Sequence, residues 1–119
     1  MSNPQQYCLT LNLRDDDELI REYEGYHKPG NVWPEVIDSI RESGILDMRI
    51  YRSGLLLIMI MTVSDTFSFE NKALRDNGNP RVGEWESLMA RFQKADEQSM
   101  ADEKWQPASE VFALEDHSN

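Results

Sequence analysis

The fold of this chain is decided by one stretch, residues 45–61, which reads ILDMRIYRSGLLLIMIM. Its first half alternates apolar and polar side chains as far as Tyr51, which is the pattern of a strand buried on one face. Gly54 then marks a short turn, and the run from Leu55 to Met61 is almost continuously apolar, as in a central strand. The stretch therefore predicts a β-hairpin whose second strand lies inside a sheet.

The residues before this hairpin predict one strand followed by two helices. Alternation over residues 7–13 predicts the strand. Three aspartates, residues 15–17, favour a helix start, and the apolar stripe that follows predicts a helix that ends near Lys28. A second helix begins at Trp33-Pro34, because proline is tolerated in a first turn, and ends at Gly44.

The residues after the hairpin predict two more helices. The third begins at Ser64 or Asp65, either of which can cap it, and runs to about Leu74. The turn-rich sequence DNGNP, residues 76–80, separates it from the fourth. The apolar stripe of the fourth helix consists of Val82, Trp85, Leu88, Met89 and Phe92.

The C-terminal part predicts a loop, a strand and a tail. Residues 95–104 are mostly charged and polar and are expected to loop out. Trp105 and the apolar group Val111–Leu114 predict a final strand, and residues 115–119 a frayed end.

This order of elements predicts the α+β class with a ferredoxin-like β-α-β-β-α-β arrangement, in which the helices lie on one face of an antiparallel sheet. The 119 residues suit one domain, 1–119, with a core over about 7–114. The other face of the sheet needs a cover. We therefore expect a homodimer that packs sheet to sheet and encloses a small pocket in each subunit.

Composition excludes several classes of function. The formal charge of -10 repels nucleic acid and anionic membranes, so neither is an expected partner. The polar N-terminus is unlike a signal peptide, and the run from Leu55 to Met61 is too short to span a bilayer. The single cysteine, Cys8, cannot form an internal disulfide, which is consistent with the cytoplasm.

The segment from Tyr23 to Glu35 carries the candidate chemistry. His27 follows Tyr23 by four residues, so the two side chains share one helical face. The simpler interpretation is that Tyr23 packs on the sheet while His27 ends the helix. Histidine can exchange a proton near neutral pH, and a helix C-terminus favours its protonated form, so His27 is expected to act as an acid. We find no metal-ligand spacing, phosphate loop or nucleophile motif, and predict no cofactor or metal.

Trp33 and Trp85 are both consistent with core positions, since each lies on an apolar helical stripe. Trp85 is the better candidate for a wall against which the C–H face of a sugar ring lies. Glu84 and Glu86 flank it, and Arg81 precedes it by about one helical turn.

Taken in order, these elements resemble the L-rhamnose mutarotase family, which includes L-fucose mutarotases. The resemblance covers residues 7–114 and implies a dimeric α+β barrel that opens and recloses a pyranose at its anomeric carbon without a cofactor. It implies His27 as proton donor, Tyr23 as a sugar-binding residue and Trp85 as the pocket tryptophan. The matching motifs are Tyr23-x-x-x-His27, Trp33-Pro34-Glu35, the stretch Gly44–Met61, Trp85 with Leu88-Met89, and Glu110-Val111-Phe112-x-Leu114.

Two positions depart from the L-rhamnose enzymes. Met48 replaces a tyrosine, and Glu86, a further candidate for substrate binding, replaces a second tryptophan. The expected substrate is therefore a 6-deoxyhexose, L-fucose first and L-rhamnose next, with Glu86, Tyr23 or water as the base. Two alternatives are a cofactor-independent oxygenase or haem-binding enzyme on the same barrel and a non-catalytic sugar-binding module.

Overall fold

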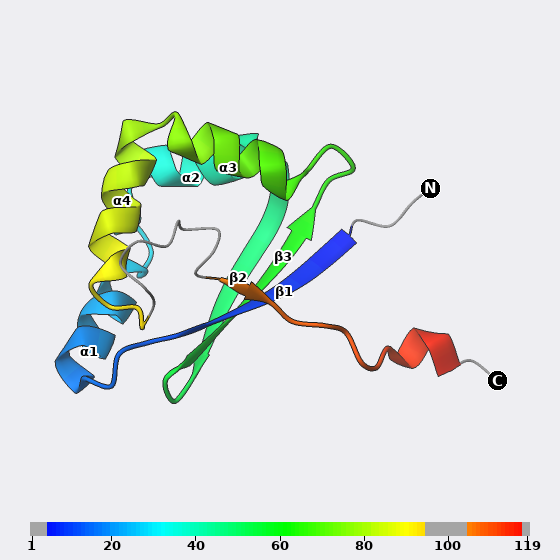
Figure 1. Cartoon of the computed structure of the whole chain (residues 1–119), viewed down its shortest axis with the longest axis horizontal. Coiled ribbons are helices and arrows are strands. Elements are labelled where there is room, and N and C mark those ends of the chain that lie inside the picture. The colour runs from blue at the N-terminus through cyan, green and yellow to red at the C-terminus, as the bar shows by residue number, and fades with distance from the viewer. Residues whose placement is uncertain (1–4, 95–104, 118–119) are drawn as a thin grey trace.

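The computed structural model describes residues 5–94 and 105–117. Its strands are β1 (Gln5–Asn12), β2 (Ile45–Ser53), β3 (Leu56–Val63) and β4 (Gln106–Pro107), and its helices are α1 (Asp17–Tyr26), α2 (Pro34–Glu42), α3 (Phe69–Asn77) and α4 (Pro80–Ala90). The strands form one antiparallel sheet in the order β2-β3-β1-β4, with the helices packed on one side (Figure 1). The predicted α+β class and ferredoxin-like arrangement are confirmed.

Capping residues set where the helices begin. The side chain of Asp16 accepts hydrogen bonds from the backbone N–H groups of Glu18 and Leu19 at the start of α1. At the start of α2, Pro34 occupies the first turn and Trp33 precedes it, as predicted. These caps position the two segments that carry Tyr23, His27 and Trp33.

Two glycines shape the ends of the hairpin. Gly54 has φ +61° in the turn between β2 and β3. Gly44 has φ +96° between α2 and β2, where a Cβ atom would lie 2.9 Å from Oγ of Ser64. Glycine is required at position 44, because other residues rarely adopt that backbone conformation and because the position has no space for a side chain. The predicted hairpin and the helix end at Gly44 are both confirmed.

The two faces of the sheet differ in chemistry. Leu9 and Leu11 of β1 and Leu57, Met59 and Met61 of β3 point to the helices and are buried. The intervening residues point to the opposite side of the sheet, which we call the open face. None of those on β1 and β3 is fully buried. On β1 and β3 the open face consists of Gln6, Cys8, Thr10, Asn12, Leu56, Ile58, Ile60 and Thr62, and none of these residues is charged.

Two sequence predictions are wrong. The third helix begins at Phe69 rather than after Ser64 or Asp65, because Ser68 supplies the cap by accepting a hydrogen bond from the N–H of Asn71. The final strand is limited to Gln106–Pro107, which pairs with β1. Val111–Leu114 does not continue this strand.

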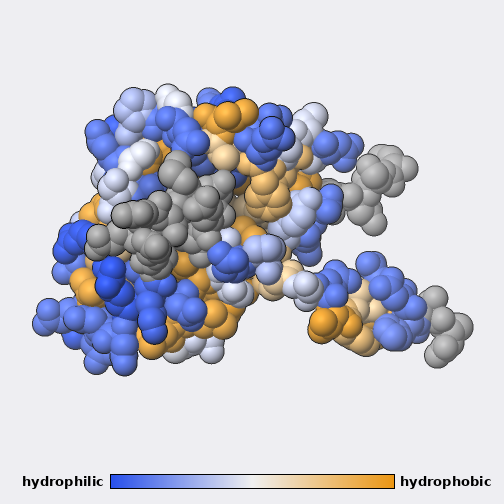
Figure 2. All heavy atoms as spheres, in the orientation of Figure 1, coloured by the Kyte–Doolittle hydropathy of each residue, from blue (hydrophilic) through white to orange (hydrophobic). Residues whose placement is uncertain are grey.

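Beyond β4 the chain leaves the body of the molecule as an arm (Figures 1 and 2). Val111 is 95% exposed, and Leu114–His117 forms a 3₁₀ turn in place of the predicted frayed end. The predicted loop at residues 95–104 lies outside the described residues. Within the described ranges, none of the helices has the length and apolar character needed to cross a membrane.

Candidate active site

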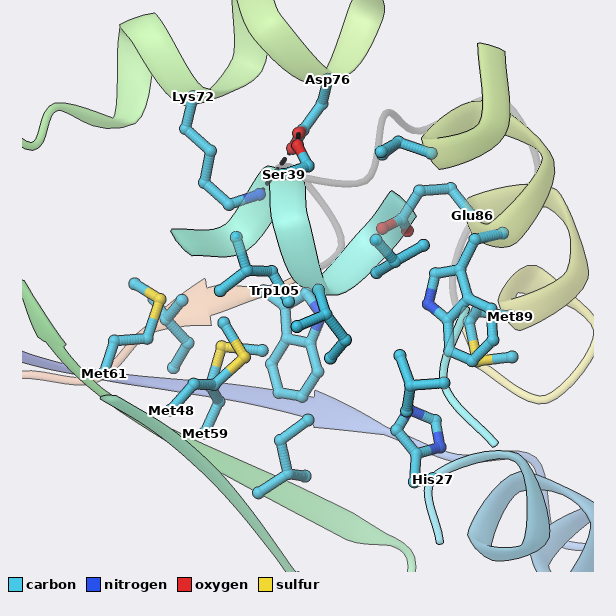
Figure 3. A pocket seen from close by; sticks show the side chains of 18 of the residues that line it. His27, Ser39, Met48, Met59, Met61, Lys72, Asp76, Glu86, Met89 and Trp105 are labelled. Atoms are coloured by element: carbon cyan, nitrogen blue, oxygen red, sulfur yellow. Dashed lines mark hydrogen bonds and ion pairs between the residues drawn. The ribbon is translucent and has the colours of Figure 1, made fainter. Parts of the chain in front are cut away.

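A cavity of about 530 Å³ lies between the sheet and the helices. All four residues predicted from the sequence line it: Tyr23 and His27 from the end of α1, and Trp85 and Glu86 from α4. Figure 3 shows His27 and the carboxylate of Glu86 on the same side of this cavity. Folding therefore brings together residues that are about sixty positions apart in the sequence.

The cavity has apolar walls and a few polar groups. Met48, Met59 and Met61 of the sheet form one wall, away from His27 (Figure 3). On the helical side, Ser39 donates a hydrogen bond of 3.2 Å to Asp76, which also pairs with Lys72. An apolar cavity with a small number of polar groups is typical of a binding site for a small molecule. No group of three or more potential metal ligands occurs in the part of the chain that the structure describes.

His27 is held in a defined orientation at the end of α1. Its Nδ1 lies 2.7 Å from the carbonyl oxygen of Tyr23, to which the Nδ1–H group donates a hydrogen bond. The ring centroids of the same two residues are 4.2 Å apart. Because Nδ1 carries the proton of this bond, Nε2 is the nitrogen that holds the lone pair in the neutral ring.

The protonation state of His27 differs from the expectation. Burial lowers its pKa below 6.5, and the hydrogen bond to Tyr23 only partly offsets this effect. At pH 7 the imidazole is therefore mainly neutral, whereas the position at a helix end predicted a protonated one. The cause is desolvation of the imidazole in the folded chain, which the position at a helix end does not reveal.

Tyr23 keeps its phenolic proton across the physiological range. Burial raises its pKa, and the negative charge of Glu86 raises it further. The phenol is thus a hydrogen-bond donor in this cavity. The same effect indicates that Glu86 lies close enough to Tyr23 for their charges to interact.

Trp85 is buried and touches His27 on one side and Trp33 on the other. Its ring centroid lies 5.6 Å from that of His27 and 5.2 Å from that of Trp33, both in edge-on geometry. Trp85 lines the cavity, whereas Trp33 does not. Trp33 therefore packs against Trp85 without lining the cavity. Its position at the start of α2 is the one predicted from the sequence.

A profile of the L-rhamnose mutarotase family matches residues 6–114 of this chain. The chain belongs to this family. It is 48% identical, over 92% of its length and 88% of the relative, to an L-fucose mutarotase from Xanthomonas campestris. It is also 32% identical to a UPF0734 protein from Dictyostelium discoideum, over 93% of this chain and 90% of that protein.

The fold agrees with this assignment. A crystal structure of an L-rhamnose mutarotase from Formosa agariphila superimposes with a TM-score of 0.66, covering 92% of this chain and 97% of that one at 19% identity. The two positions at which the sequence departs from the L-rhamnose enzymes, Met48 and Glu86, both line the cavity. Both departures therefore lie at the cavity and not on the outer surface.

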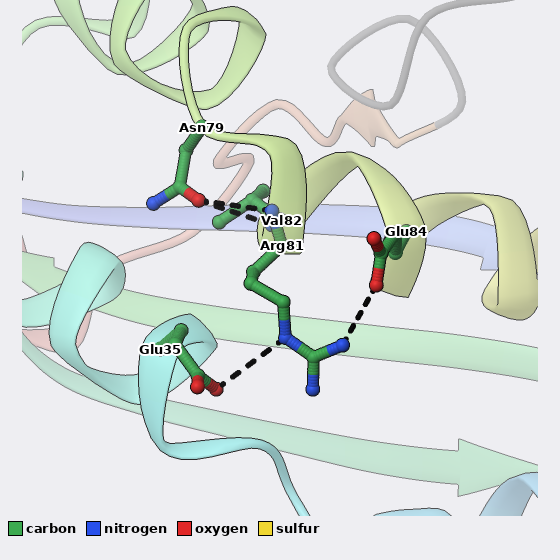
Figure 4. Close-up of polar contacts among 5 residues, drawn as sticks. All are labelled: Glu35, Asn79, Arg81, Val82 and Glu84. Atoms are coloured by element: carbon green, nitrogen blue, oxygen red, sulfur yellow. Dashed lines mark hydrogen bonds and ion pairs between the residues drawn. The ribbon is translucent and has the colours of Figure 1, made fainter.

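Arg81 packs against Trp33, one member of the tryptophan pair, and forms the two ion pairs that Figure 4 shows. Its guanidinium lies 4.0 Å from the ring centroid of Trp33 and pairs with Glu84 at 2.7 Å and Glu35 at 3.8 Å. Each exposed ion pair contributes little to stability; the pair with Glu35 links the start of α2 to that of α4, whereas the pair with Glu84 lies within α4. Arg81 is thus a positioning residue rather than a cavity residue.

Sequence reasoning gave no site role to Trp105 or Gln93, both of which line the cavity. Trp105 lies between the methionine wall and His27 in Figure 3, whereas the sequence predicted it only as part of the final strand. Gln93 is 4% exposed and follows Met89 by four residues. Gln93 therefore occupies the next position on the apolar stripe of the fourth helix. A polar residue at such a position could have indicated a role in the site.

Proposed function

We propose that this chain is a sugar mutarotase that interconverts the α and β anomers of a 6-deoxyhexose, with L-fucose preferred over L-rhamnose. The observation that carries this proposal is the position of His27, whose free Nε2 lies in one cavity with Tyr23, Trp85 and Glu86. The 48% identity to an L-fucose mutarotase supports the choice of sugar.

Mutarotation requires a proton to leave the C1 hydroxyl while the ring oxygen gains one. Neutral His27 accepts the proton of the C1 hydroxyl at Nε2. The phenol of Tyr23 donates its proton to the ring oxygen as the bond between C1 and the ring oxygen breaks, which leaves a tyrosinate. Rotation about C1–C2 then turns the aldehyde, and the ring closes on its other face. In closure the tyrosinate of Tyr23 takes back the proton from the former ring oxygen as that oxygen attacks C1, and the imidazolium of His27 donates its proton to the carbonyl oxygen. Both residues thereby return to their starting states.

The remaining groups bind and orient the sugar. The ring of Trp85 lies against the apolar C–H face of the pyranose, while Glu86 accepts hydrogen bonds from its hydroxyl groups. A positioned acid–base pair accelerates proton transfer by about 10²- to 10⁴-fold, which is sufficient for a reaction that also proceeds slowly in water. The oxygenase alternative is not favoured.

The open face of the sheet supports a homodimer. Eight residues of β1 and β3 on this face carry no charge, although the chain as a whole has a net charge of -10. Two copies can therefore pack sheet to sheet without bringing like charges together on the central strands. The single cysteine supports a cytoplasmic location, since Cys8 has no internal partner for a disulfide.

Saturation-transfer NMR of anomeric exchange tests the proposal directly. The wild-type protein is expected to accelerate exchange of L-fucose most, L-rhamnose next and an aldose without a 6-deoxy group least. His27→Ala is expected to lose this acceleration, with circular dichroism showing that it remains folded. Exchange of both 6-deoxy sugars at the rate of buffer, despite clear binding, would instead indicate a non-catalytic sugar-binding module.

A further inference from the structure

We propose that Gln93 is a specificity-determining residue that holds two adjacent hydroxyl groups of the sugar. This inference rests on the proposed function and extends it to a contact that neither the sequence motifs nor the family resemblance identified. It begins from one atom. Oε1 of Gln93 is buried and has no hydrogen-bond partner among the residues that the structure describes.

An unpaired amide oxygen in this position destabilises the folded protein. A buried polar group without a partner has lost its hydrogen bonds to water and gained none in exchange. Side chains with this property in native proteins call for an explanation such as a bound water or ligand. Gln93 lines the cavity, so a molecule that enters there can reach its amide.

The backbone around Gln93 is fixed, so the side chain cannot easily move out to solvent. Gln93 forms an antiparallel bridge with Leu13. The N–H of Lys94 donates to the carbonyl oxygen of Asn12 at 2.8 Å, and that of Arg14 donates to Phe92 at 2.9 Å. These bonds hold the segment after α4 against the end of β1, which keeps the amide at the cavity.

The amide of Gln93 matches the chemistry of a vicinal diol. Its oxygen accepts a hydrogen bond and its NH₂ group donates one, so two neighbouring hydroxyl groups can each form a bond with it. One hydroxyl donates to Oε1 while the next accepts from Nε2. A pair of hydroxyl groups with the wrong configuration would leave the oxygen unpaired again, and this penalty is the physical basis of discrimination between 6-deoxyhexoses.

The test compares Gln93→Met with the wild-type protein. Methionine has nearly the same length but no polar group, so the variant removes both the unpaired oxygen and the proposed contact. We expect two opposite changes. Without sugar, the variant should unfold at a temperature about 3 °C or more above that of the wild-type protein. Its KM for L-fucose exchange should be about tenfold above the wild-type value, with kcat little changed.

A matched control makes the same substitution on the surface. Gln5→Met lies at the exposed start of β1 and should change neither the unfolding temperature nor KM. Monodeoxy analogues of L-fucose then identify the hydroxyl groups concerned. Removal of either bound hydroxyl should weaken binding to the wild-type protein but have little further effect on Gln93→Met.

The outcomes separate this inference from the proposed function. If Gln93→Met keeps the wild-type KM and the wild-type response to every analogue, the inference is wrong while the mutarotase function stands. A variant that is only less stable, with its KM unchanged, would show a packing role and would also overturn the inference. If the wild-type protein neither binds nor exchanges any 6-deoxyhexose, the proposed function fails and the inference fails with it.

Discussion

His27 donates a hydrogen bond to the backbone of Tyr23, the residue whose aromatic ring lies against the imidazole. Nδ1 of the histidine and the carbonyl oxygen of the tyrosine are 2.7 Å apart, and the two ring centroids are 4.2 Å apart. This relationship fixes the tautomer of His27 as well as its position. The reactive nitrogen is therefore Nε2, and its lone pair is available when the ring is neutral.

The pH dependence of exchange should report the lowered pKa of His27. Below this pKa the imidazolium has no free lone pair, so kcat/KM should fall about tenfold per pH unit on the acid side. The midpoint should lie below 6.5, because burial lowers the pKa from that value. NMR exchange rates measured across the range give the profile, and a rate that rises on acidification would contradict the assigned direction of proton transfer.

The same pKa shift affects folding stability. The unfolded chain binds a proton at His27 more tightly than the folded protein does, so His27 contributes stability above pH 6.5. This contribution is lost as the pH falls through the lowered pKa. Urea unfolding of wild type and His27→Gln at several pH values should show a smaller acid destabilisation in the variant, and parallel curves would count against the shift.

Tyr23→Phe tests the phenol separately from the aromatic ring. Loss of the proton donor to the ring oxygen should lower kcat and kcat/KM together, by about tenfold or more. Tyr26→Phe is the matched control on the same helix, because Tyr26 packs on Trp85 and Phe92 but does not line the cavity. Equal activities of the two variants would exclude the proposed role of Tyr23.

Trp85→Phe tests the apolar wall. The smaller ring covers less of the sugar, and we expect KM to rise about three- to tenfold while the fold is retained. Trp33→Phe changes a tryptophan of the same pair that lies outside the cavity, and it should alter stability more than KM. Isothermal titration with L-fucose measures both variants; a larger loss of affinity for Trp33→Phe would reverse the assignment.

Ile60→Lys tests the homodimer. Ile60 lies in the middle of the open face, where a lysine would bring a charge into the proposed interface. Light scattering should give twice the chain mass for the wild type and a monomer for the variant at equal concentration. Leu46→Lys, at a site 63% exposed on the edge strand, should remain dimeric. A wild-type monomer at all concentrations would contradict the dimer.

Leu57→Ala tests the core that supports the cavity. Leu57 is 1% exposed in the central strand β3, so its truncation should lower the free energy of unfolding by about 2–5 kcal/mol. Leu74→Ala on the surface of α3, where the side chain is 65% exposed, should change it by about 0.5 kcal/mol or less. Urea denaturation compares the two, and similar losses would mean that the core is assigned incorrectly.

Local patterns were sufficient to predict most of the fold. The stretch at residues 45–61 gives a hairpin because alternation, a turn glycine and an apolar run all favour the same structure. The four-residue spacing of Tyr23 and His27 predicted their shared face for the same local reason. By contrast, Ser64 and Ser68 are equally good capping residues in sequence, and only the tertiary structure selects Ser68.

The remaining errors depend on contacts between distant segments. Val111–Leu114 has the composition of a strand but finds no position in the sheet, so composition alone misassigned it. The protonation state of His27 depends on how completely the folded chain surrounds it, which its position at a helix end does not reveal. The sequence marks Gln93 only as a polar residue on the apolar stripe of α4. The absence of a partner for its buried oxygen is visible only in the folded chain.

Residues from α1, from α4 and Trp105 line one cavity although they are far apart in the sequence. A sugar bound there would therefore be released whenever one of these segments unfolds. The stability of the folded protein is therefore expected to rise with the concentration of its sugar ligand. At a sugar concentration one hundred times Kd, binding raises the free energy of unfolding by about 2.7 kcal/mol, and proteases that attack the unfolded chain find correspondingly fewer targets. A cell growing on the sugar would accumulate more of this protein without making more.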